Sequence, residues 1–332
     1  MSRVNPFQPI YNLCNTGNSV QKFADLPDFP RLMDIELTNL CNFRCLMCPT
    51  GNFSQKRTKG YLADALYEKL LDEVAPHGTA LRFIRFGEPT MHPRFIDYIR
   101  MASDRGLLTH VNTNGSKLDD DTIRALCDIP LSSLKFSFQG VDAKSYGEMR
   151  NTDFFQGLVD TIRRFAEIRG DRDLPYLHVS TSITYETPEQ VAEFTALLQP
   201  IVDQVSVGHT VLDHLDMNTI RLRPAELEML KWLKTQQSLV KEHPECPEVY
   251  DKLSVNWDGT ISACCADSDN IMLTGDFNTH SIAEIWRSDQ LQEFRTVLAR
   301  HGHDELPLCK TCYNYSGLYK TIPTPGDQDD TL

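Results

Sequence analysis

The sequence predicts an α/β protein, in which a partial (β/α)6 barrel is followed by a small cysteine-rich domain. From Arg31 onward, short apolar runs alternate with amphipathic stretches, which is typical of a parallel sheet whose strands are joined by helical crossovers. Six such units are too few for the standard eight-stranded barrel, and they suit an open partial barrel. After residue 242 the alternation stops and the chain becomes rich in loops and cysteines, which predicts a second, smaller domain.

The elements of the predicted barrel follow one another along the chain. Apolar runs predict strands at 32–38, 80–86, 107–113, 134–138, 176–183 and 202–208. Amphipathic stretches predict helices at 63–74, 93–104, 119–127, 155–168, 188–199 and 224–242. In the cysteine-rich part, Asp258-Gly259 predicts the turn of a hairpin, and residues 281–300 predict one further helix.

These patterns divide the 332 residues into four parts. Residues 1–30 show no clear period, and we expect an irregular N-terminal extension there. Residues 31–242 form the predicted barrel, and residues 243–320 form the cysteine-rich domain. Residues 321–332 are expected to be a disordered tail because of their Pro, Gly and Asp content.

Composition excludes several classes of protein. The formal net charge is −13, which disfavours nucleic-acid binding because that function needs clustered positive charge. No apolar run reaches the about 20 residues that a membrane helix requires, and the N-terminus lacks the apolar core of a secretory signal. We therefore expect a cytoplasmic protein without a nucleic-acid or membrane partner.

The ten cysteines point to metal or catalysis, since disulfides are disfavoured in a reducing compartment. Cys41, Cys45 and Cys48 follow the first predicted strand with the spacing C-x3-C-x2-C. Three thiolates can hold three irons of a cubane cluster and leave the fourth iron open to a ligand. A structural zinc site is the alternative, but it prefers four protein ligands and this loop contains no histidine.

The loop sequence CNFRCLMCP resembles the defining motif of the radical S-adenosylmethionine (SAM) superfamily. The family usually has an aromatic residue before the third cysteine, where this chain has Met47. The resemblance implies a [4Fe–4S] cluster whose open iron chelates SAM, and a 5′-deoxyadenosyl radical that removes a hydrogen atom from the substrate. It also implies a flavodoxin- or ferredoxin-type electron donor.

Further segments resemble the SAM-binding motifs of that family, in the same order. They are Phe86-Gly87-Glu88-Pro89, Thr113-Asn114-Gly115, Ser137-Phe138-Gln139-Gly140 with Tyr146 and Arg150, and the strand that contains Ser182. Phe86 replaces the usual first glycine, and Gln139 stands where an acid is commoner. The resemblance implies SAM contacts from Gly87, Glu88, Asn114, Ser137, Arg150 and Ser182.

A second set of cysteines resembles the SPASM/Twitch extension of many radical SAM enzymes. The segments are Cys246-x12-Gly259-x4-Cys264 and Cys309-x2-Cys312, whose four cysteines are enough to close one auxiliary [4Fe–4S] cluster. No cysteine follows Cys312, so we expect no second auxiliary cluster, and a four-cysteine zinc site is the alternative. Cys265 is interpreted as an alternative ligand, a hydrogen-atom donor or a simple neighbour of a ligand.

The sequence thus predicts a radical SAM oxidoreductase, of the dehydrogenase type, that acts on a small sugar- or aminocyclitol-like molecule. An electron left after hydrogen abstraction would pass to the auxiliary cluster. An epimerase, a peptide-modifying maturase of the sulfatase or ribosomal-peptide type, and a non-enzymatic metal-binding module are the alternatives. Polar residues after the sixth strand are substrate-site candidates, together with Cys265 as a possible hydrogen donor: His209, Asp213, His214 and Asp216.

Overall fold

The computed structural model describes residues 3–15, 18–210, 212, 215–236 and 246–312. One curved sheet runs through this part of the chain, in the strand order β6-β5-β4-β3-β2-β1-β7-β8-β9. The first six strands are mutually parallel, which confirms the predicted partial barrel. They are β1 (Leu32–Ile35), β2 (Ala80–Phe83), β3 (Thr109–Thr113), β4 (Ser133–Ser137), β5 (Tyr176–Ile183) and β6 (Gln204–His209).

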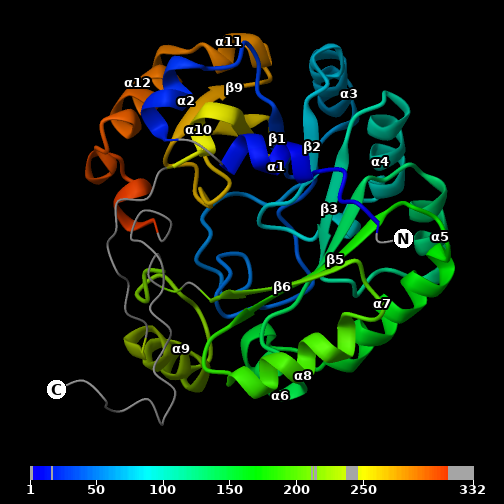
Figure 1. Ribbon diagram of the computed structural model, residues 1–332. Coiled ribbons are helices and arrows are strands. Elements are labelled where there is room, and N and C mark those ends of the chain that lie inside the picture. Colours follow the sequence, from blue (N-terminus) through cyan, green and yellow to red (C-terminus); the bar gives the residue numbers. More distant parts are fainter. Residues whose placement is uncertain (1–2, 16–17, 211, 213–214, 237–245, 313–332) are drawn as a thin grey trace.

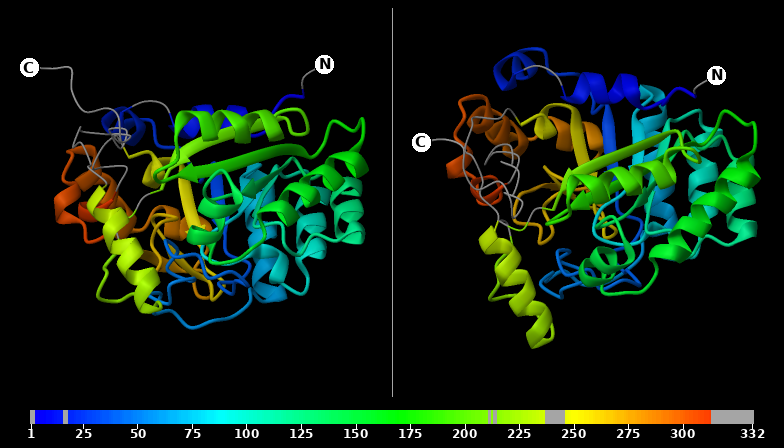
Figure 2. Two further views of the ribbon diagram at one scale, coloured as in Figure 1. Left: turned by 90° about the horizontal axis from the view of Figure 1, so that it is seen from below. Right: turned by 60° about the horizontal axis from the view of Figure 1, so that its bottom comes forward.

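Helices connect the parallel strands and lie along the outside of the sheet (Figures 1 and 2). Each buries an apolar stripe against the strands; one of them buries Phe95, Tyr98, Ile99 and Ala102. Polar side chains cap several helix starts, such as Asp119 and Thr187. The connecting helices are α3 (Asp64–Val74), α4 (Phe95–Asp104), α5 (Asp120–Asp128), α6 (Ala143–Arg150), α7 (Phe155–Arg169) and α8 (Pro188–Leu198).

The inner face of the sheet is polar. On β4, Leu134 and Phe136 belong to the core under the helices, so Lys135 between them points to the inner face. Hydrogen bonds and ion pairs between neighbouring strands show the same alternation across the sheet. The inner-facing polar residues in these strands include Asp34, Arg82, His110, Asn112, Lys135, His178 and Ser206.

The C-terminal domain is joined to the barrel through the sheet itself. Strand β7 (Lys252–Val255) pairs in parallel with β1, and β8 (Thr260–Ser262) and β9 (Leu273–Asp276) continue as an antiparallel meander. The predicted hairpin turn is confirmed between β7 and β8, where Gly259 adopts the positive φ of +86°. The cysteine-bearing loops are therefore anchored to the first barrel strand.

The N-terminal residues differ from the prediction of an irregular extension, which is wrong. They form α1 (Gln8–Asn15) and α2 (Ser19–Ala24), the latter capped by the Asn18 side chain. Phe7 and Cys14 pack on Leu32 and Ala80, at the starts of β1 and β2. The segment thus covers the end of the barrel opposite the carboxyl ends of the strands. Each helix is too short to show a periodic signal in sequence.

Other predicted elements also differ in extent. The helix expected at 281–300 is two helices, α11 (Ile282–Trp286) and α12 (Asp289–Ala299), because Ser288 caps a new start. The expected helix at 224–242 is described as α9 (Pro224–Gln236), and its remainder and the predicted tail lie outside the described residues. The smaller helices are α10 (Glu248–Asp251), η1 (Ala75–His77), η2 (Pro89–Met91), η3 (His303–Glu305) and η4 (Cys309–Thr311). None of the described helices is long and apolar enough to cross a membrane.

The inner-face histidine His178 predicts a specific loss of stability in acid. Burial, and secondarily the charge of Lys135, lowers its pKa to about 4, whereas an unfolded histidine has a pKa of about 6.5. As the pH falls below about 6.5, the unfolded chain binds a proton at this histidine and the folded chain does not, so the unfolding free energy decreases. Between pH 7 and pH 5 the wild type should lose about 2 kcal/mol more unfolding free energy than His178→Gln. Urea denaturation at the two pH values measures this difference, and equal losses in both proteins would contradict it.

Candidate active site and auxiliary cysteine cluster

The loop after β1 brings Cys41, Cys45 and Cys48 together. The three thiols are close enough to interact electrostatically with one another, and Phe43 N donates to the Cys41 sulfur at 3.4 Å. Burial raises the pKa of Cys41 to about 12 and also raises the pKa of Cys48. Buried thiols that lie together in this way become thiolates when a metal displaces their protons. The donor set therefore suits a cluster held by three cysteines.

Backbone contacts fix the shape of this loop. A β-carbon on Gly51 would lie 2.4 Å from the Cys45 carbonyl oxygen, so only glycine fits where the chain after the third cysteine passes the Cys45 backbone. Asn52 donates to the Leu46 carbonyl at 2.9 Å, and Thr50 donates to the Phe86 carbonyl at 2.5 Å. The cysteine loop is thereby tied to the end of β2.

Glu88 is the polar centre of the neighbouring strand ends. It is 3% exposed, and its Oε1 accepts hydrogen bonds from Thr90 Oγ1 and Thr113 Oγ1, both at 2.7 Å. Its Oε2 accepts one from Asn114 N at 2.7 Å. Burial raises the pKa of Glu88, although these hydrogen bonds oppose that shift. The carboxylate therefore clamps the ends of β2 and β3 together, a role that the motif alone did not suggest.

Gly87 and Asn114 hold the same region against the cysteine loop. A β-carbon on Gly87 would lie 1.9 Å from the Thr38 carbonyl oxygen, and Asn114 Nδ2 donates to Asn42 Oδ1 at 3.0 Å. The residues predicted from the second and third motifs are thus next to the predicted cluster loop.

Arg150, at the end of α6, joins the cysteine loop to β4. Its Nη1 donates to the Cys45 sulfur at 3.5 Å, and its Nη2 donates to the Ser137 carbonyl. Its Nε is buried and has no hydrogen-bond partner among the described residues, and the same holds for the hydroxyl of Tyr146. An unsatisfied buried guanidinium nitrogen beside a cysteine ligand fits an anionic group bound there.

Ser137 and Ser182 end neighbouring strands and are both partly exposed. The Ser182 carbonyl accepts hydrogen bonds from Gln139 Nε2 at 3.0 Å and Gly140 N at 2.9 Å. Gln139, which stands in place of the usual acid, also donates to Thr210 on the next connection. The fourth and fifth motifs therefore meet at the carboxyl ends of β4 and β5.

The second group of cysteines is also assembled. Electrostatic interactions connect Cys246 with Cys309 and Cys312, and Cys264 with Cys246. Burial raises the pKa of Cys246, and it raises the pKa of Cys309 to about 12. Four thiols from three separate segments are thus connected by electrostatic interactions, and we expect them to ligate one cluster.

Cys265 lies beside this group on the side that faces the barrel. Its thiol donates to Glu248 Oε2 at 3.9 Å, and Cys264, Cys265 and Glu248 place possible ligand atoms within 4.8 Å of one another. A hydrogen bond to Cys265, followed by burial, raises the pKa of Cys264 well above its ordinary value. Cys265 also interacts electrostatically with Arg82 and Lys135 on the inner face.

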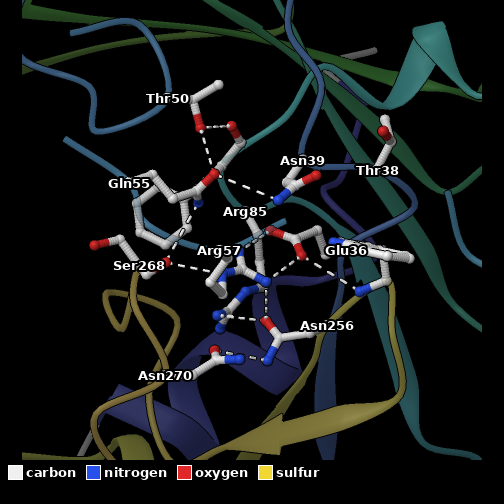
Figure 3. Close-up of polar contacts among 12 residues, drawn as sticks. Glu36, Thr38, Asn39, Thr50, Gln55, Arg57, Arg85, Asn256, Ser268 and Asn270 are labelled. Atoms are coloured by element: carbon white, nitrogen blue, oxygen red, sulfur yellow. Dashed lines mark hydrogen bonds and ion pairs between the residues drawn. The ribbon is translucent and has the colours of Figure 1, made fainter. Parts of the chain in front are cut away.

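Two arginines join the barrel to the auxiliary domain (Figure 3). Arg57, from the loop that follows the first cysteines, forms a two-pronged ion pair with Glu36 at 2.6 and 2.8 Å. The same guanidinium donates to Asn256 Oδ1 at 3.0 Å and to the Ser268 carbonyl at 2.8 Å. Glu36 follows β1 and Asn256 follows β7, so Arg57 connects the two strand ends across the domain boundary.

Arg85 makes the second connection, through a hydrogen bond to the backbone of the predicted cluster ligand Cys264. It precedes Phe86-Gly87-Glu88 and donates to the Cys264 carbonyl at 3.1 Å and the Asp267 carbonyl at 2.9 Å. It also donates to Asn256 Oδ1 at 2.9 Å, the oxygen that Arg57 shares. The backbone of the auxiliary ligand loop is therefore held by a side chain that lies beside the SAM-binding motif.

The remaining candidates lie at the end of β6 or outside the described part. His209 is the last residue of β6 and is partly exposed. Asp216 accepts hydrogen bonds from Asn218 N at 2.9 Å and Nδ2 at 3.0 Å, which stabilises its own exposed turn. Asp213 and His214 lie outside the described residues, so their place in the site stays a prediction.

Sequence reasoning missed the arginine bridge and the charged inner face. The inner face does have a signal, because polar residues alternate with apolar ones in strands such as LKFSF and YLHVSTSI. The bridge has no such signal, because Arg57 and Arg85 contact residues that are up to 211 positions away in sequence.

The bridge yields a prediction about stability. The side chain of Arg57 is 6% exposed and that of Glu36 is fully buried, so Arg57→Ala leaves an unpaired buried carboxylate. We expect it to lower the unfolding free energy by about 3–5 kcal/mol. The matched control is Arg94→Ala, which removes an exposed pair with Asp64 and should cost less than about 1 kcal/mol. Chemical denaturation compares the two; similar small losses would mean that Arg57 is not a structural bridge.

Comparison with known proteins agrees with this geometry. The radical SAM superfamily model matches residues 35–198, and the SPASM iron–sulfur cluster-binding domain model matches residues 246–313. A relative in Pyrococcus furiosus, the tungsten-containing aldehyde ferredoxin oxidoreductase cofactor-modifying protein, is 24% identical over 84% of this chain and 86% of its own. The PqqA peptide cyclase of Bradyrhizobium diazoefficiens is 25% identical over 72% of this chain and 58% of its own.

Solved structures show the same fold. The Streptococcus suis protein SuiB, bound to its precursor peptide SuiA, superposes with a TM-score of 0.65 at 15% identity, over 90% of this chain and 72% of SuiB. BtrN in complex with AdoMet and 2-DOIA superposes with a TM-score of 0.54 at 17% identity, over 85% of this chain and 92% of BtrN. The two family matches and the two assembled cysteine groups lead to one conclusion: the chain belongs to the radical SAM superfamily and carries a C-terminal SPASM iron–sulfur domain, with SAM and [4Fe–4S] clusters as its cofactors.

Proposed function

We propose that this enzyme oxidises its substrate by two electrons, beginning with removal of a hydrogen atom. The observation that supports this is that Cys246, Cys264, Cys309 and Cys312 interact electrostatically, and we propose that they supply four ligands. A cluster closed by four thiolates has no open iron for a substrate, so accepting an electron is the role that suits it. Hydrogen-atom removal takes one electron and one proton from the substrate. The substrate radical then passes its second electron to such an acceptor and releases a proton to solvent.

The chain's own residues would arrange this chemistry at the carboxyl ends of the strands. SAM bound at the first cluster supplies a 5′-deoxyadenosyl radical after one-electron reduction. Arg150 is placed to hold an anionic group beside Cys45 through its unsatisfied Nε. Ser137 and Ser182 present hydroxyls at neighbouring strand ends, and we propose that they contact the nucleoside part.

Glu88 has a more limited role in this proposal than its motif implies. Oε1 already accepts from Thr90 and Thr113, whereas Oε2 accepts only from Asn114 N among the described residues. A carboxylate oxygen has two lone pairs, so Oε2 can accept one more hydrogen bond, such as one from the SAM ammonium. We propose that Glu88 first fixes the strand ends and then receives SAM through this one oxygen.

Two substrate classes remain, and a different observation favours each. The likeness to BtrN, solved with AdoMet and 2-DOIA, favours the proposal of a small-molecule substrate. The peptide-modifying assignment is supported by PqqA peptide cyclase, by the mycofactocin maturase MftC of Mycobacterium tuberculosis and by SuiB. MftC is 25% identical over 54% of this chain. We propose the oxidation for either class, with a flavodoxin- or ferredoxin-type donor supplying the first electron.

The mass of the product, measured after reaction in heavy water, distinguishes oxidation from epimerisation. If the substrate is oxidised, the product is two hydrogens lighter and takes up no deuterium in heavy water, and Cys265→Ala remains active. A Cys265 thiol that returned a hydrogen atom would instead give a product with one deuterium, and Cys265→Ala would stall. Mass spectrometry of products formed by anaerobically reconstituted enzyme, with SAM and reductant, makes the measurement. Deuterium incorporation would overturn the oxidation proposal.

A further inference from the structure

Lys135 is a charged residue in the middle of the polar inner face. It lies between Leu134 and Phe136, which are fully buried under the helices, and it therefore points into the concave side of the sheet. Strand register places it next to Asn112 on β3 and His178 on β5. It is two residues before Ser137, so it lies about 6–7 Å along the strand from the proposed SAM contact.

Two other cations of the inner face, Arg82 and Lys252, have carboxylate partners. Arg82 binds Asp34 through two hydrogen bonds of 2.6 and 2.8 Å, and Lys252 pairs with Glu248 at 2.5 Å. Within the described part of the chain, the Lys135 ammonium has neither a hydrogen bond nor an ion pair. Lys135 is partly exposed, and its ammonium is therefore available to pair with an anionic group of a ligand.

The surroundings leave Lys135 as the available positive charge. Burial lowers the pKa of His110 and of His178, so both rings are neutral near pH 7. Asp34 is already engaged by Arg82, which also repels Lys135. Burial, and then Arg82, lowers the pKa of Lys135 to about 8, which still leaves the protonated form in the majority at pH 7. An anion bound here would offset both the burial of the Lys135 ammonium and its repulsion by Arg82.

A second donor lies beside this ammonium. Asn112 Oδ1 is bonded to His110 Nε2 at 2.7 Å, which leaves the Asn112 Nδ2 group without a hydrogen-bond partner in the described structure. An ammonium and an amide N–H₂ on neighbouring strands match the two oxygens of a carboxylate. A phosphate would carry more charge than one free cation can balance.

We propose that Lys135, assisted by Asn112, binds a carboxylate of the substrate on the inner face of the barrel. The inference rests on the proposed function, since it assigns the place where the oxidised molecule is held. A carboxylate bound at Lys135 and Asn112 would place the rest of the substrate between the proposed SAM contacts and Cys265. The carboxylate could belong to a small acid or to a Glu side chain of a peptide, and the chemistry at Lys135 is the same for both.

Competitive labelling of amines tests this proposal. Reconstituted protein with SAM bound is treated with trace acetic anhydride, and acetylation of each lysine is read by peptide mass spectrometry. The probes are two matched pairs: gluconate against glucitol, and the peptide acetyl-Gly-Glu-Gly-amide against its Gln counterpart. Exposed Lys144, on α6, is the internal control. An acid that lowers labelling of Lys135 several-fold, while its neutral partner and Lys144 show no change, supports the proposal and identifies the source of the carboxylate.

A second measurement uses variants. Saturation-transfer NMR of the protecting acid should detect binding to wild type and Lys135→Arg, and no binding to Lys135→Gln. If neither acid protects Lys135, or if Lys135→Gln binds the acid as well as wild type, the proposal is overturned. Formation of 5′-deoxyadenosine is recorded in the same wild-type preparation. Its formation without protection overturns only the Lys135 inference, whereas protection without its formation supports Lys135 and overturns the proposed function.

Discussion

The arrangement of the two cysteine groups depends on one buried contact, the meeting of Arg57 and Arg85 on Asn256 Oδ1 (Figure 3). Arg57 brings the segment after the first cysteines to this oxygen, and Arg85 brings the end of β2. Asn256 itself is fully buried at the turn after β7. Two like charges approach one acceptor only because Glu36 and several carbonyl oxygens compensate them. The contact thus determines how the SPASM domain is placed relative to the barrel.

From this contact, the geometry of the site follows in steps. Pairing of β7 with β1 sets the register, and Arg85 then holds the Cys264 carbonyl near the SAM-binding motif. Glu88, three residues later, joins β2 to β3. The first cysteine loop, the SAM motifs and the auxiliary ligand loop are therefore linked through five consecutive residues, 84–88. Most polar groups of this buried network have partners, whereas the buried Arg85 Nε has none among the described residues.

Sequence reasoning succeeded where the chemistry is local. The spacing of Cys41, Cys45 and Cys48 and the alternation of strands and helices are short-range patterns, and they predicted the fold and the family correctly. It failed where structure depends on distant contacts. The helix near Gln8 is stable only because it packs on strand starts such as Leu32, which no local pattern reveals. Arg85 likewise acquires its role from residues more than 170 positions away. Lys135 could be predicted in part. Its alternation with Leu134 and Phe136 is visible in the sequence, whereas its lack of a partner among the described residues is not.

The central claim is that this chain holds two iron–sulfur clusters of different kinds, one open to SAM and one closed by protein. The most direct test is electron paramagnetic resonance of the anaerobically reconstituted, reduced protein, combined with iron and zinc analysis. We predict about eight irons per chain, no zinc and two cluster signals. Addition of SAM should change only one signal, and this is the signal that disappears when Cys41, Cys45 and Cys48 are all replaced by alanine. About four irons with one zinc per chain, or a SAM-sensitive signal that survives in the triple variant, would contradict the account.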